Sequence, residues 1–374
     1  MKAVDSVDLV VVGAGFAGLC CAHRAARQGL QVRVLERQAE AGVRVHTTGL
    51  LVQEVVERLD PPRTLLRRIE RLRLHAPNLD HVEVEAPGYG FHATDTPGLM
   101  RWLGARAIEA GAEVRCGSAF RDAHRRGGWI ELPEHGVRAR WLVGADGPRS
   151  QVARCFGLQE NTRFLVGVEE EVCGLSPPSD HLHCFLDAQL APGYFGWLFR
   201  GVHGVSQFGV AAALPHRPDL DGMAAKLCGT SVDFRLATRV GRRGGLIPVG
   251  GPLRNWHAPG VLLAGDAAGL VSPLTAGGIH AAIDHGERIA DAIAAQLRRP
   301  SFDVVAAVEA KNPRFRGARW MRGAFEHFAD DALMDAMIGR PWMASLIRRL
   351  AYRRAVTPPG QPRLGPGAGV LGRR

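Results

Sequence analysis

Lysine is nearly absent from this sequence. Its 374 residues include 47 basic side chains, and only Lys2, Lys226 and Lys311 among them are lysines. An arginine bias of this kind, with abundant alanine and glycine, is typical of a GC-rich coding sequence, so the net charge of +10 does not by itself indicate a polyanionic partner. Basic runs interleaved with aromatic residues are also absent, and we therefore expect no nucleic-acid partner.

Two further absences concern membrane spans and metal or disulfide sites. No run of about 18 apolar residues occurs, so no segment is expected to span a bilayer. The 7 cysteines form no C-x-x-C pair, and an odd, scattered set is typical of a protein in a reducing cytoplasm. His181, His183 and Cys184 lie in a strand-like segment without a partner cluster, and we predict no metal site there.

The N-terminal region contains a complete dinucleotide-binding pattern. A buried-strand pattern at 8–12 leads into the turn 13–18 (GAGFAG), a helix to about residue 28, and a second strand at 31–35 that ends in Glu36. Gly13 permits a tight turn, Gly15 lets the backbone approach a pyrophosphate, and Gly18 lets helix and strand pack closely. A carboxylate at Glu36 can accept hydrogen bonds from ribose hydroxyls. This arrangement predicts a cofactor that contains ADP.

Two later segments repeat the combination of a strand, an acidic residue and a helix start. One is 144–150 (GADGPRS), with Asp146 in the turn. The other is 261–290, in which an apolar strand meets Gly265-Asp266 and an alanine-rich helix begins near Gly277-Gly278. A carboxylate at a strand end can hold a polyol, and the free N–H groups of a helix start can hold a negative charge. FAD has both features, a ribityl chain and a pyrimidine edge that becomes anionic on reduction.

The order of these segments predicts an α/β protein with a Rossmann-type FAD-binding domain, an inserted antiparallel-sheet substrate domain and a C-terminal helical region. Strands of alternating character between 164 and 214 indicate the antiparallel sheet. We assign 1–75, 95–158 and 245–298 to the FAD-binding domain, and 76–94 and 159–244 to the substrate domain. Residues 299–354 should be largely helical, and 355–374, rich in Pro, Gly and Arg, should be a disordered tail.

Together the three motifs resemble those of the FAD-dependent oxidoreductases of the para-hydroxybenzoate hydroxylase fold, over roughly residues 8 to 300. Within that group the chain is most similar to the geranylgeranyl reductase family. Residues 272–279 (SPLTAGGI) match the family's N/S-P-L-T-G-G-G-I loop, and 192–199 (PGYFGWLF) match most of its P-x-x-Y-x-W-x-F-P motif. Phe195 stands where the family has Tyr, and Arg200 where it has Pro.

The resemblance implies how the cofactor would be held. The pyrophosphate would lie on the turn from Gly13 to Gly18, the ribose on Glu36, the ribityl chain on Asp266, and the pyrimidine edge on the amides of Gly278 and Ile279. The full set of candidate FAD contacts is Gly13, Gly15, Ala17, Gly18, Glu36, Arg37, Arg44, Arg101, Asp146, Gly265, Asp266, Gly277, Gly278 and Ile279. Phe195, Trp197, Phe199 and Pro273 would line an apolar substrate pocket.

The chain departs from the family close to the expected flavin position. The loop at 44–49 (RVHTTG) lacks the family's Cys-Gly pair, and His46 near that place is the single candidate catalytic residue. The family's arginine before the next helix is replaced by 94–96 (TDT), which leaves Arg101 as a candidate substitute.

The family's activity implies that reduced flavin delivers hydride to carbon–carbon double bonds of an isoprenoid or other apolar small molecule. No second glycine-rich unit for NAD(P)H occurs, so the electron donor is either transiently bound NAD(P)H or a redox partner protein such as ferredoxin. The alternative is an FAD-dependent monooxygenase that hydroxylates an aromatic or polyketide substrate with NAD(P)H and oxygen. A halogenase and a non-redox flavoprotein are further alternatives.

The segment 342–354 (WMASLIRRLAYRR) combines large apolar residues with four arginines at near-helical spacing. This pattern suggests a peripheral contact with the inner face of the membrane. A helix packed on the FAD domain with a solvated arginine face is the competing interpretation.

Overall fold

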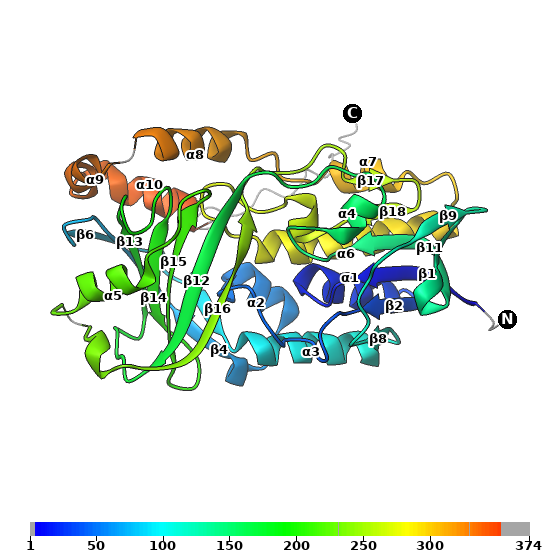
Figure 1. The fold of residues 1–374 in the computed structure, drawn as a ribbon, viewed down its shortest axis with the longest axis horizontal. Coiled ribbons are helices and arrows are strands. Elements are labelled where there is room, and N and C mark those ends of the chain that lie inside the picture. Colours follow the sequence, from blue (N-terminus) through cyan, green and yellow to red (C-terminus); the bar gives the residue numbers. More distant parts are fainter. Residues whose placement is uncertain (1–3, 231, 329, 353–374) are drawn as a thin grey trace, which may run out of the picture.

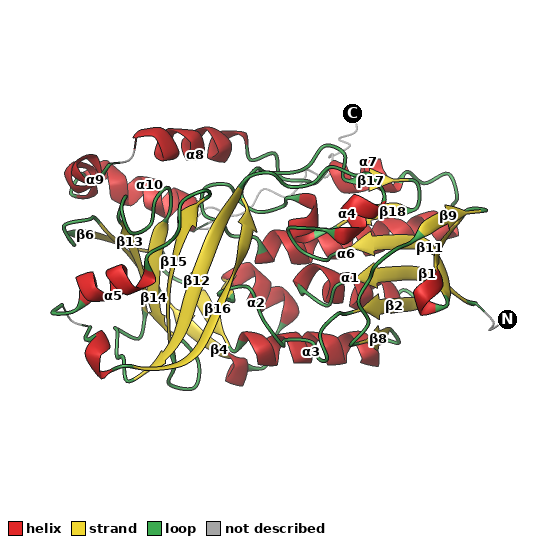
Figure 2. Cartoon of the chain, in the orientation of Figure 1, coloured by secondary structure: helices red, strands yellow, loops and turns green. Residues whose placement is uncertain are grey.

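A computed structural model describes residues 4–230, 232–328 and 330–352 of the chain. The predicted disordered tail at 355–374 lies outside the described residues. Two regions lie end to end along the molecule (Figure 1). One is built on a mainly parallel sheet near the N-terminus, and the other on a mainly antiparallel sheet beside the C-terminal helices. Figure 2 shows that helices and strands alternate in the first region and are segregated in the second.

The first region is the predicted Rossmann-type unit. Its eight-stranded sheet has the order β17-β18-β11-β1-β2-β8, with β10 paired to β11 and β9 paired to β10. The strands β18, β11, β1, β2 and β8 are parallel. The bounds are β1 (Asp5–Val12), β2 (Val32–Leu35), β8 (Glu113–Arg115), β9 (His124–Arg126), β10 (Trp129–Leu132), β11 (Val137–Gly144), β17 (His257–Ala258) and β18 (Val261–Leu263).

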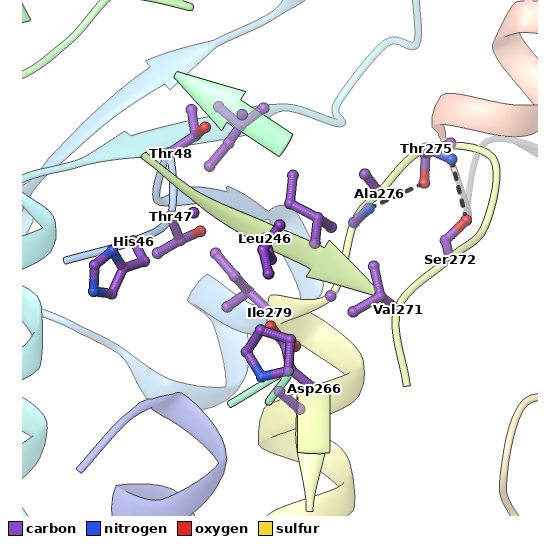
Figure 3. A pocket seen from close by; sticks show the side chains of 18 of the residues that line it. His46, Thr47, Thr48, Leu246, Asp266, Val271, Ser272, Thr275, Ala276 and Ile279 are labelled. Atoms are coloured by element: carbon purple, nitrogen blue, oxygen red, sulfur yellow. Dashed lines mark hydrogen bonds between the residues drawn. The ribbon is translucent and has the colours of Figure 1, made fainter. Parts of the chain in front are cut away.

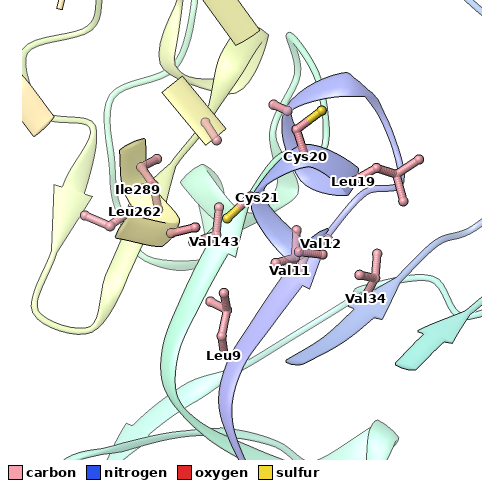
Figure 4. Packing of buried hydrophobic residues seen from close by; sticks show 14 of the residues in the cluster. Leu9, Val11, Val12, Leu19, Cys20, Cys21, Val34, Val143, Leu262 and Ile289 are labelled. Atoms are coloured by element: carbon pink, nitrogen blue, oxygen red, sulfur yellow. The ribbon is translucent and has the colours of Figure 1, made fainter. Parts of the chain in front are cut away.

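Helices pack on this sheet, and the close contact between two of them, α1 and α6, depends on a glycine in α6. The helices are α1 (Phe16–Ala26), α3 (Thr96–Glu109), α4 (Gln151–Cys155), α6 (Ile279–Arg298) and α7 (Val304–Glu309). A Cβ on Gly286 of α6 would lie 2.3 Å from the carbonyl oxygen of Ala17, so α1 and α6 can touch only because residue 286 has no side chain. Figure 4 shows the core at this contact, with Cys20 and Cys21 packed among Leu and Val side chains. Burial raises the pKa of the Cys20 thiol to about 12, so this thiol is a packing group rather than a nucleophile.

The second region is a seven-stranded sheet of order β16-β12-β15-β14-β13-β5-β6, antiparallel except where β13 runs parallel to β5. The four strands predicted between 164 and 214 are confirmed as β12 (Phe164–Cys173), β13 (His181–Leu186), β14 (Phe195–Arg200) and β15 (Ser206–Ala213). The sheet also takes in β5 (Arg71–His75), β6 (His81–Glu85) and β16 (Thr238–Pro248). The sequence-based divisions at residues 75 and 244 therefore fall inside this sheet, because hydrophobic pattern identifies a strand but not its partner.

Smaller elements connect and cover the two regions. A three-stranded sheet is formed by β3 (Leu50–Val52), β7 (Phe91–Thr94) and β4 (Leu66–Ile69), and α2 (Gln53–Leu59) follows β3. Between β15 and β16 lie α5 (Leu220–Leu227) and a short 3₁₀ turn, η3 (Phe234–Leu236), separated by Gly229 at φ +93°. The other 3₁₀ turns are η1 (Arg63–Leu65), η2 (Pro133–His135) and η4 (Gly265–Ala268).

The C-terminal helices α8 (Arg316–Phe328), α9 (Asp331–Ile338) and α10 (Pro341–Ala351) confirm the predicted helical region. They lie beside the seven-stranded sheet, at the end away from the N-terminus (Figure 1). Hydrogen bonds from the Tyr352 hydroxyl to the Val84 carbonyl, 3.0 Å, and from Arg348 Nε to the Glu85 carbonyl, 3.2 Å, anchor the end of α10 to β6. Within the described residues, no helix combines the length and apolarity that crossing a bilayer requires.

Candidate FAD and substrate cavity

Four of the predicted site features meet at one edge of the parallel sheet. The glycine turn follows β1, Glu36 follows β2, Asp146 follows β11 and Asp266 follows β18. Because these strands are adjacent and parallel, their carboxyl ends share an edge, which is where open α/β sheets bind ligands. Residues more than 200 positions apart in sequence are thereby brought to one site.

A single cavity of about 1660 Å³ runs from this edge to the seven-stranded sheet. We call the part beside Gly13, Glu36, Asp146 and Asp266 the nucleotide end. We call the part walled by the seven-stranded sheet and by α8, α9 and α10 the apolar chamber. Figure 3 shows where the two meet: Leu246 of β16 projects between the loop at 46–48 and the loop at 271–276, with Ile279 and Asp266 nearby.

At the nucleotide end, the turn after β1 is fixed by backbone geometry. Gly13 has φ +101°, and a Cβ there would lie 2.4 Å from the carbonyl oxygen of Ala145, so only glycine fits. A Cβ on Gly15 would meet nothing within 4 Å, which leaves open space for a ligand at this position. A Cβ on Gly18 would lie 1.9 Å from the Gly13 carbonyl oxygen. Gly18 does not line the cavity and serves close packing, whereas Gly13, Gly15 and Ala17 line it.

Glu36 ties the two strand ends together. One carboxylate oxygen accepts a hydrogen bond from the Ala14 amide and the other from the Gln38 amide, each at 2.8 Å. The carboxylate is held at the cavity wall in a fixed orientation, from which its remaining lone pairs can accept hydrogen bonds from a ligand.

Asp146 lines the cavity but is engaged mainly with its own helix. Its carboxylate accepts hydrogen bonds from the Ser150 hydroxyl at 2.7 Å and from the Gln151 and Val152 amides at 2.7 and 3.1 Å. Desolvation by burial raises the pKa of Asp146 despite these bonds. Asp146 therefore organises the start of α4, and the Ser150 side chain caps that helix by accepting from the Ala153 amide.

Asp266 is in a different situation. No hydrogen bond to its carboxylate is found among the described residues, and burial raises its pKa to about 6. The start of α6 lies beside it: Gly278 is the N-cap, no side chain caps the helix, and Gly277, Gly278 and Ile279 line the cavity. An unsatisfied carboxylate next to an uncapped helix start fits a ligand that carries hydroxyl groups and a negative or polarised edge. These residues therefore fit the ribityl and pyrimidine parts of FAD.

Gly265, Arg101 and Pro273 do not line the cavity. A Cβ on Gly265 would lie 3.0 Å from the Ala17 Cβ, so this glycine permits packing of the motif against α1. Arg101 is exposed on α3 and pairs with Glu40 at 3.6 Å. Arg101 thus does not itself line the cavity, whereas its partner Glu40 does.

Arg37, Arg44 and His46 do line the cavity, and all three are exposed. Arg44 has φ +53°, a conformation uncommon for a residue with a side chain. His46 Nδ1 lies 2.7 Å from the Gly244 carbonyl oxygen. Since a carbonyl only accepts, that ring nitrogen donates and Nε2 is the nitrogen available to a ligand.

In the apolar chamber, strand alternation decides which side chains face the cavity. Leu182, Cys184 and Leu186 of β13 line it, while His181, His183 and Phe185 between them face the other side of the sheet. On β14 the same alternation places Phe195, Trp197 and Phe199 on the cavity wall.

A buried ion pair between Glu169 and Arg243 stands in this largely apolar wall, and the buried Arg322 of α8 is a second ionic group there. The Glu169 carboxylate accepts a hydrogen bond from Trp197 Nε1 at 2.7 Å and from Arg243 Nε at 2.6 Å. Glu169 is 3% exposed, so its charge depends on Arg243 for compensation. This pair holds the Trp197 indole in a single orientation at the cavity wall.

The structure adds cavity residues that sequence reasoning missed. Tyr194 lies one position before the expected aromatic residue, and its hydroxyl donates to the Thr275 carbonyl at 2.7 Å, which ties β14 to the loop 272–277. Burial raises the pKa of Tyr194. The helices α8, α9 and α10 supply a whole wall, and apolar residues at helical spacing were the available signal for it: Met321, Phe325, Met334, Met337, Ile338, Met343, Leu346 and Ile347.

Family models match two parts of the chain. Residues 11–65 match an NAD(P)-binding Rossmann-like domain, and residues 231–348 match the lycopene cyclase protein family. The first match begins at the last two residues of β1 and covers the glycine turn, α1, β2, β3 and α2. The second covers the strand β16, the Asp266 motif and α6 to α9, together with most of α10.

Curated relatives cover most of the chain. Digeranylgeranylglycerophospholipid reductase 2 of Methanopyrus kandleri is 33% identical over 310 residues, which is 77% of this chain and 77% of that protein. The reductase of the same name from Methanothermobacter thermautotrophicus is 30% identical over 311 residues, 77% of this chain and 78% of that protein.

Solved structures show the same fold. A geranylgeranyl bacteriochlorophyll reductase-like protein of Thermoplasma acidophilum superposes with a TM-score of 0.82 at 19% identity, covering 94% of this chain and 98% of that one. A flavin-dependent brominase gives 0.69 at 16% identity, with 92% and 93% covered. A probable FAD-dependent monooxygenase of Pseudomonas aeruginosa also gives 0.69, at 19% identity, with 89% and 99% covered. At these identities the likeness concerns the fold, which is that of FAD-dependent oxidoreductases.

Proposed function

The chain belongs to the digeranylgeranylglycerophospholipid reductase family, and from this premise we propose that it is an FAD-dependent reductase of carbon–carbon double bonds in an isoprenoid lipid. One observation carries the proposal: the nucleotide end and a long apolar chamber form one continuous cavity. Such a cavity can hold a redox cofactor and an extended apolar chain in contact with each other.

At the nucleotide end, the residues hold and orient the cofactor. The turn at 13–18 would offer its backbone to the pyrophosphate, and Glu36 would accept hydrogen bonds from the ribose. Asp266 would accept hydrogen bonds from the ribityl hydroxyls, and the start of α6 would stabilise negative charge at the pyrimidine edge. When bound and reduced, FAD supplies the hydride.

In the apolar chamber, the residues bind the chain and exclude water. Leucine, methionine and aromatic side chains on the sheet and on α8 to α10 remove the apolar surface of an isoprenoid from solvent. Flexible methionines such as Met321, Met334 and Met337 adapt to chains that differ in saturation. The Tyr194 hydroxyl holds the loop at 272–277 in place, so that the isoprenoid chain would lie against a fixed wall.

The electron donor is part of the same proposal. We propose that NAD(P)H or an iron–sulfur protein such as ferredoxin reduces the bound flavin in a transient encounter. Anaerobic stopped-flow reduction with each donor separates the two, because only the true donor bleaches the flavin absorbance at a rate that saturates with donor concentration.

The reductase proposal is tested on products. The purified flavoprotein is reduced anaerobically with dithionite, incubated with a set of prenylated lipids, and the products are analysed by mass spectrometry. A gain of two hydrogens for each double bond supports the reductase. A gain of one oxygen, with aerobic NAD(P)H consumption stimulated by an aromatic substrate, would establish the monooxygenase alternative instead.

A substitution that fills part of the apolar chamber tests whether the substrate binds there. Leu186→Trp fills part of the apolar chamber on β13, so lipid reduction should fall by roughly tenfold or more while the flavin spectrum of the protein is retained. Unchanged reduction of every lipid by this variant would place the substrate elsewhere.

A further inference from the structure

Exposed apolar residues gather where the apolar chamber opens to solvent. Nine large hydrophobic side chains are exposed in the described residues, and four of them lie on the C-terminal helices. These four are Trp320 (76% exposed), Leu333 (41%), Trp342 (52%) and Leu350 (37%). Each of the four also lines the cavity. A side chain that is both exposed and part of a cavity wall lies at its opening, so we call these four residues the mouth surface.

Exposed arginines lie on or next to the same helices as the mouth surface. Exposed arginines on or next to α8 and α10 are Arg314, Arg316, Arg319, Arg340, Arg348 and Arg349. None of them forms an ion pair with an acidic side chain in the part of the chain that the structure describes. The nearby acidic residues are engaged elsewhere: Glu326 pairs with Arg322 at 2.6 Å and with Arg163 at 2.5 Å, and Asp331 accepts from the Ala188 amide at 2.8 Å.

We propose that the mouth surface docks on a lipid bilayer that contains anionic headgroups, so that an isoprenoid lipid passes from the bilayer into the apolar chamber. Tryptophan is suited to the boundary between hydrocarbon and headgroups, because its ring is largely apolar and its N–H remains in a polar layer. Arginine side chains lay their apolar stems along such a surface and keep their charge among phosphate groups.

Charge favours a bilayer over a second copy of this chain as the occupant. A symmetric contact through this face would bring two sets of unpaired arginines together, which costs free energy. An anionic bilayer instead supplies the missing negative charge and an apolar interior at the same time. The inference rests on the proposed function for the identity of the lipid, but docking itself requires no turnover.

The first experiment is co-sedimentation of the flavin-loaded full chain with sucrose-loaded vesicles of pure phosphatidylcholine and of phosphatidylcholine with phosphatidylglycerol. The protein should sediment with the anionic vesicles and be released by salt. The double variant Trp320→Ala/Trp342→Ala should bind roughly tenfold or more weakly. The matched control Ile108→Ala, 57% exposed on α3, should bind as the wild type does.

Two double variants, each lacking two positive charges, test whether the arginines near the mouth surface contribute to binding. Arg316→Gln/Arg349→Gln should lower partitioning into anionic vesicles by on the order of tenfold. Arg125→Gln/Arg126→Gln removes the same charge from β9, at the opposite end of the molecule, and should leave partitioning nearly unchanged (Figure 1). Flavin content and thermal unfolding of each variant establish that it is folded.

Three outcomes would overturn the proposal. One is wild-type protein that stays in the supernatant with anionic vesicles. Another is a dimer in sedimentation equilibrium that the tryptophan variant converts to a monomer, since the occupant would then be a second copy. The third is vesicle binding that appears only after residues 353–374 are deleted, since the chain's own terminus would then be the occupant. Vesicle binding without lipid reduction would leave docking intact and count against the proposed function alone.

Discussion

The nucleotide end and the apolar chamber are two ends of one cavity, but they are built in different ways. At the nucleotide end the backbone makes the site: strand ends, a glycine turn and a helix start present amides and fixed carboxylates. In the apolar chamber side chains make the site, and they come from alternate positions of strands and from one side of three helices. A backbone site tolerates almost no change at a few glycines, whereas a side-chain site can be altered gradually.

Gly18→Ala tests the strictest element of the nucleotide end and should have the largest effect. The new Cβ would lie 1.9 Å from the Gly13 carbonyl oxygen; Gly13 is in the tight turn after β1, and Gly18 is in α1. We expect a loss of stability of on the order of 3 kcal/mol and protein purified with little flavin. The measurements are the flavin-to-protein absorbance ratio and urea unfolding. The control is Gly339→Ala, whose Cβ would meet nothing within 4 Å. If Gly18→Ala keeps full flavin content, the contrast between the two ends is wrong.

Glu169→Gln tests a buried ion pair in the wall of the apolar chamber. Its effect should be intermediate, because it costs a stability similar to that of Gly18→Ala without the loss of flavin. The variant leaves the Arg243 guanidinium without its buried counter-charge, and we expect about 3 kcal/mol of lost stability by urea unfolding. It also frees the Trp197 indole, so the near-ultraviolet circular dichroism should change. Glu171→Gln is the matched control, because Glu171 pairs with the same arginine at 3.0 Å but is 34% exposed. Equal losses in the two variants would show that burial is not what matters here.

Asp266→Asn tests the nucleotide end in a way that depends on pH, with the smallest effect. The pKa of Asp266 is about 6 in the folded protein, above its usual value near 4, so the folded state binds the proton more tightly than the unfolded state. The stability of the flavin-free protein should therefore fall by on the order of 2 kcal/mol between about pH 4 and pH 6 on account of this group. Asparagine removes that dependence, so the variant should be the more stable protein at pH 7 and should bind FAD more weakly.

The measurement is urea unfolding of flavin-free wild type and variant across this pH range, and the quantity of interest is their difference in unfolding free energy. A difference that stays constant from pH 4 to pH 7 would mean that Asp266 is solvated in the folded protein. Titration with FAD at pH 7 then separates stability from cofactor binding, because the two effects have opposite signs.

Local signals were sufficient for the nucleotide end. A glycine turn between a strand and a helix has one favoured geometry, so residues 8–36 could be placed from their order alone. The same logic linked the segments around Asp146 and Asp266, because the carboxyl ends of parallel strands must meet at one edge. Sequence position on α3 does not determine which way the long Arg101 side chain points: it does not line the cavity and pairs with Glu40, which does.

The apolar chamber could be predicted only in part. Alternation along 195–199 indicated which face of a strand the aromatic residues share, but not what lies opposite that face. The pairing of β5 with β13, about 100 residues apart, and the position of α8 to α10 against the sheet depend on contacts between distant segments. Amphipathic helices of this kind pack equally well on many apolar surfaces, so their pattern does not identify the surface that they cover.

The sequence by itself determined the cofactor class, the Rossmann-type unit and the family, because these rest on backbone geometry that short motifs encode. Tertiary structure decided the rest: that the cofactor edge and the apolar chamber share one cavity, that Glu169 and Arg243 meet behind Trp197, and that the exposed tryptophans stand at its mouth. The physical reason is that side-chain burial is a property of two surfaces in contact, and a linear pattern describes only one of them.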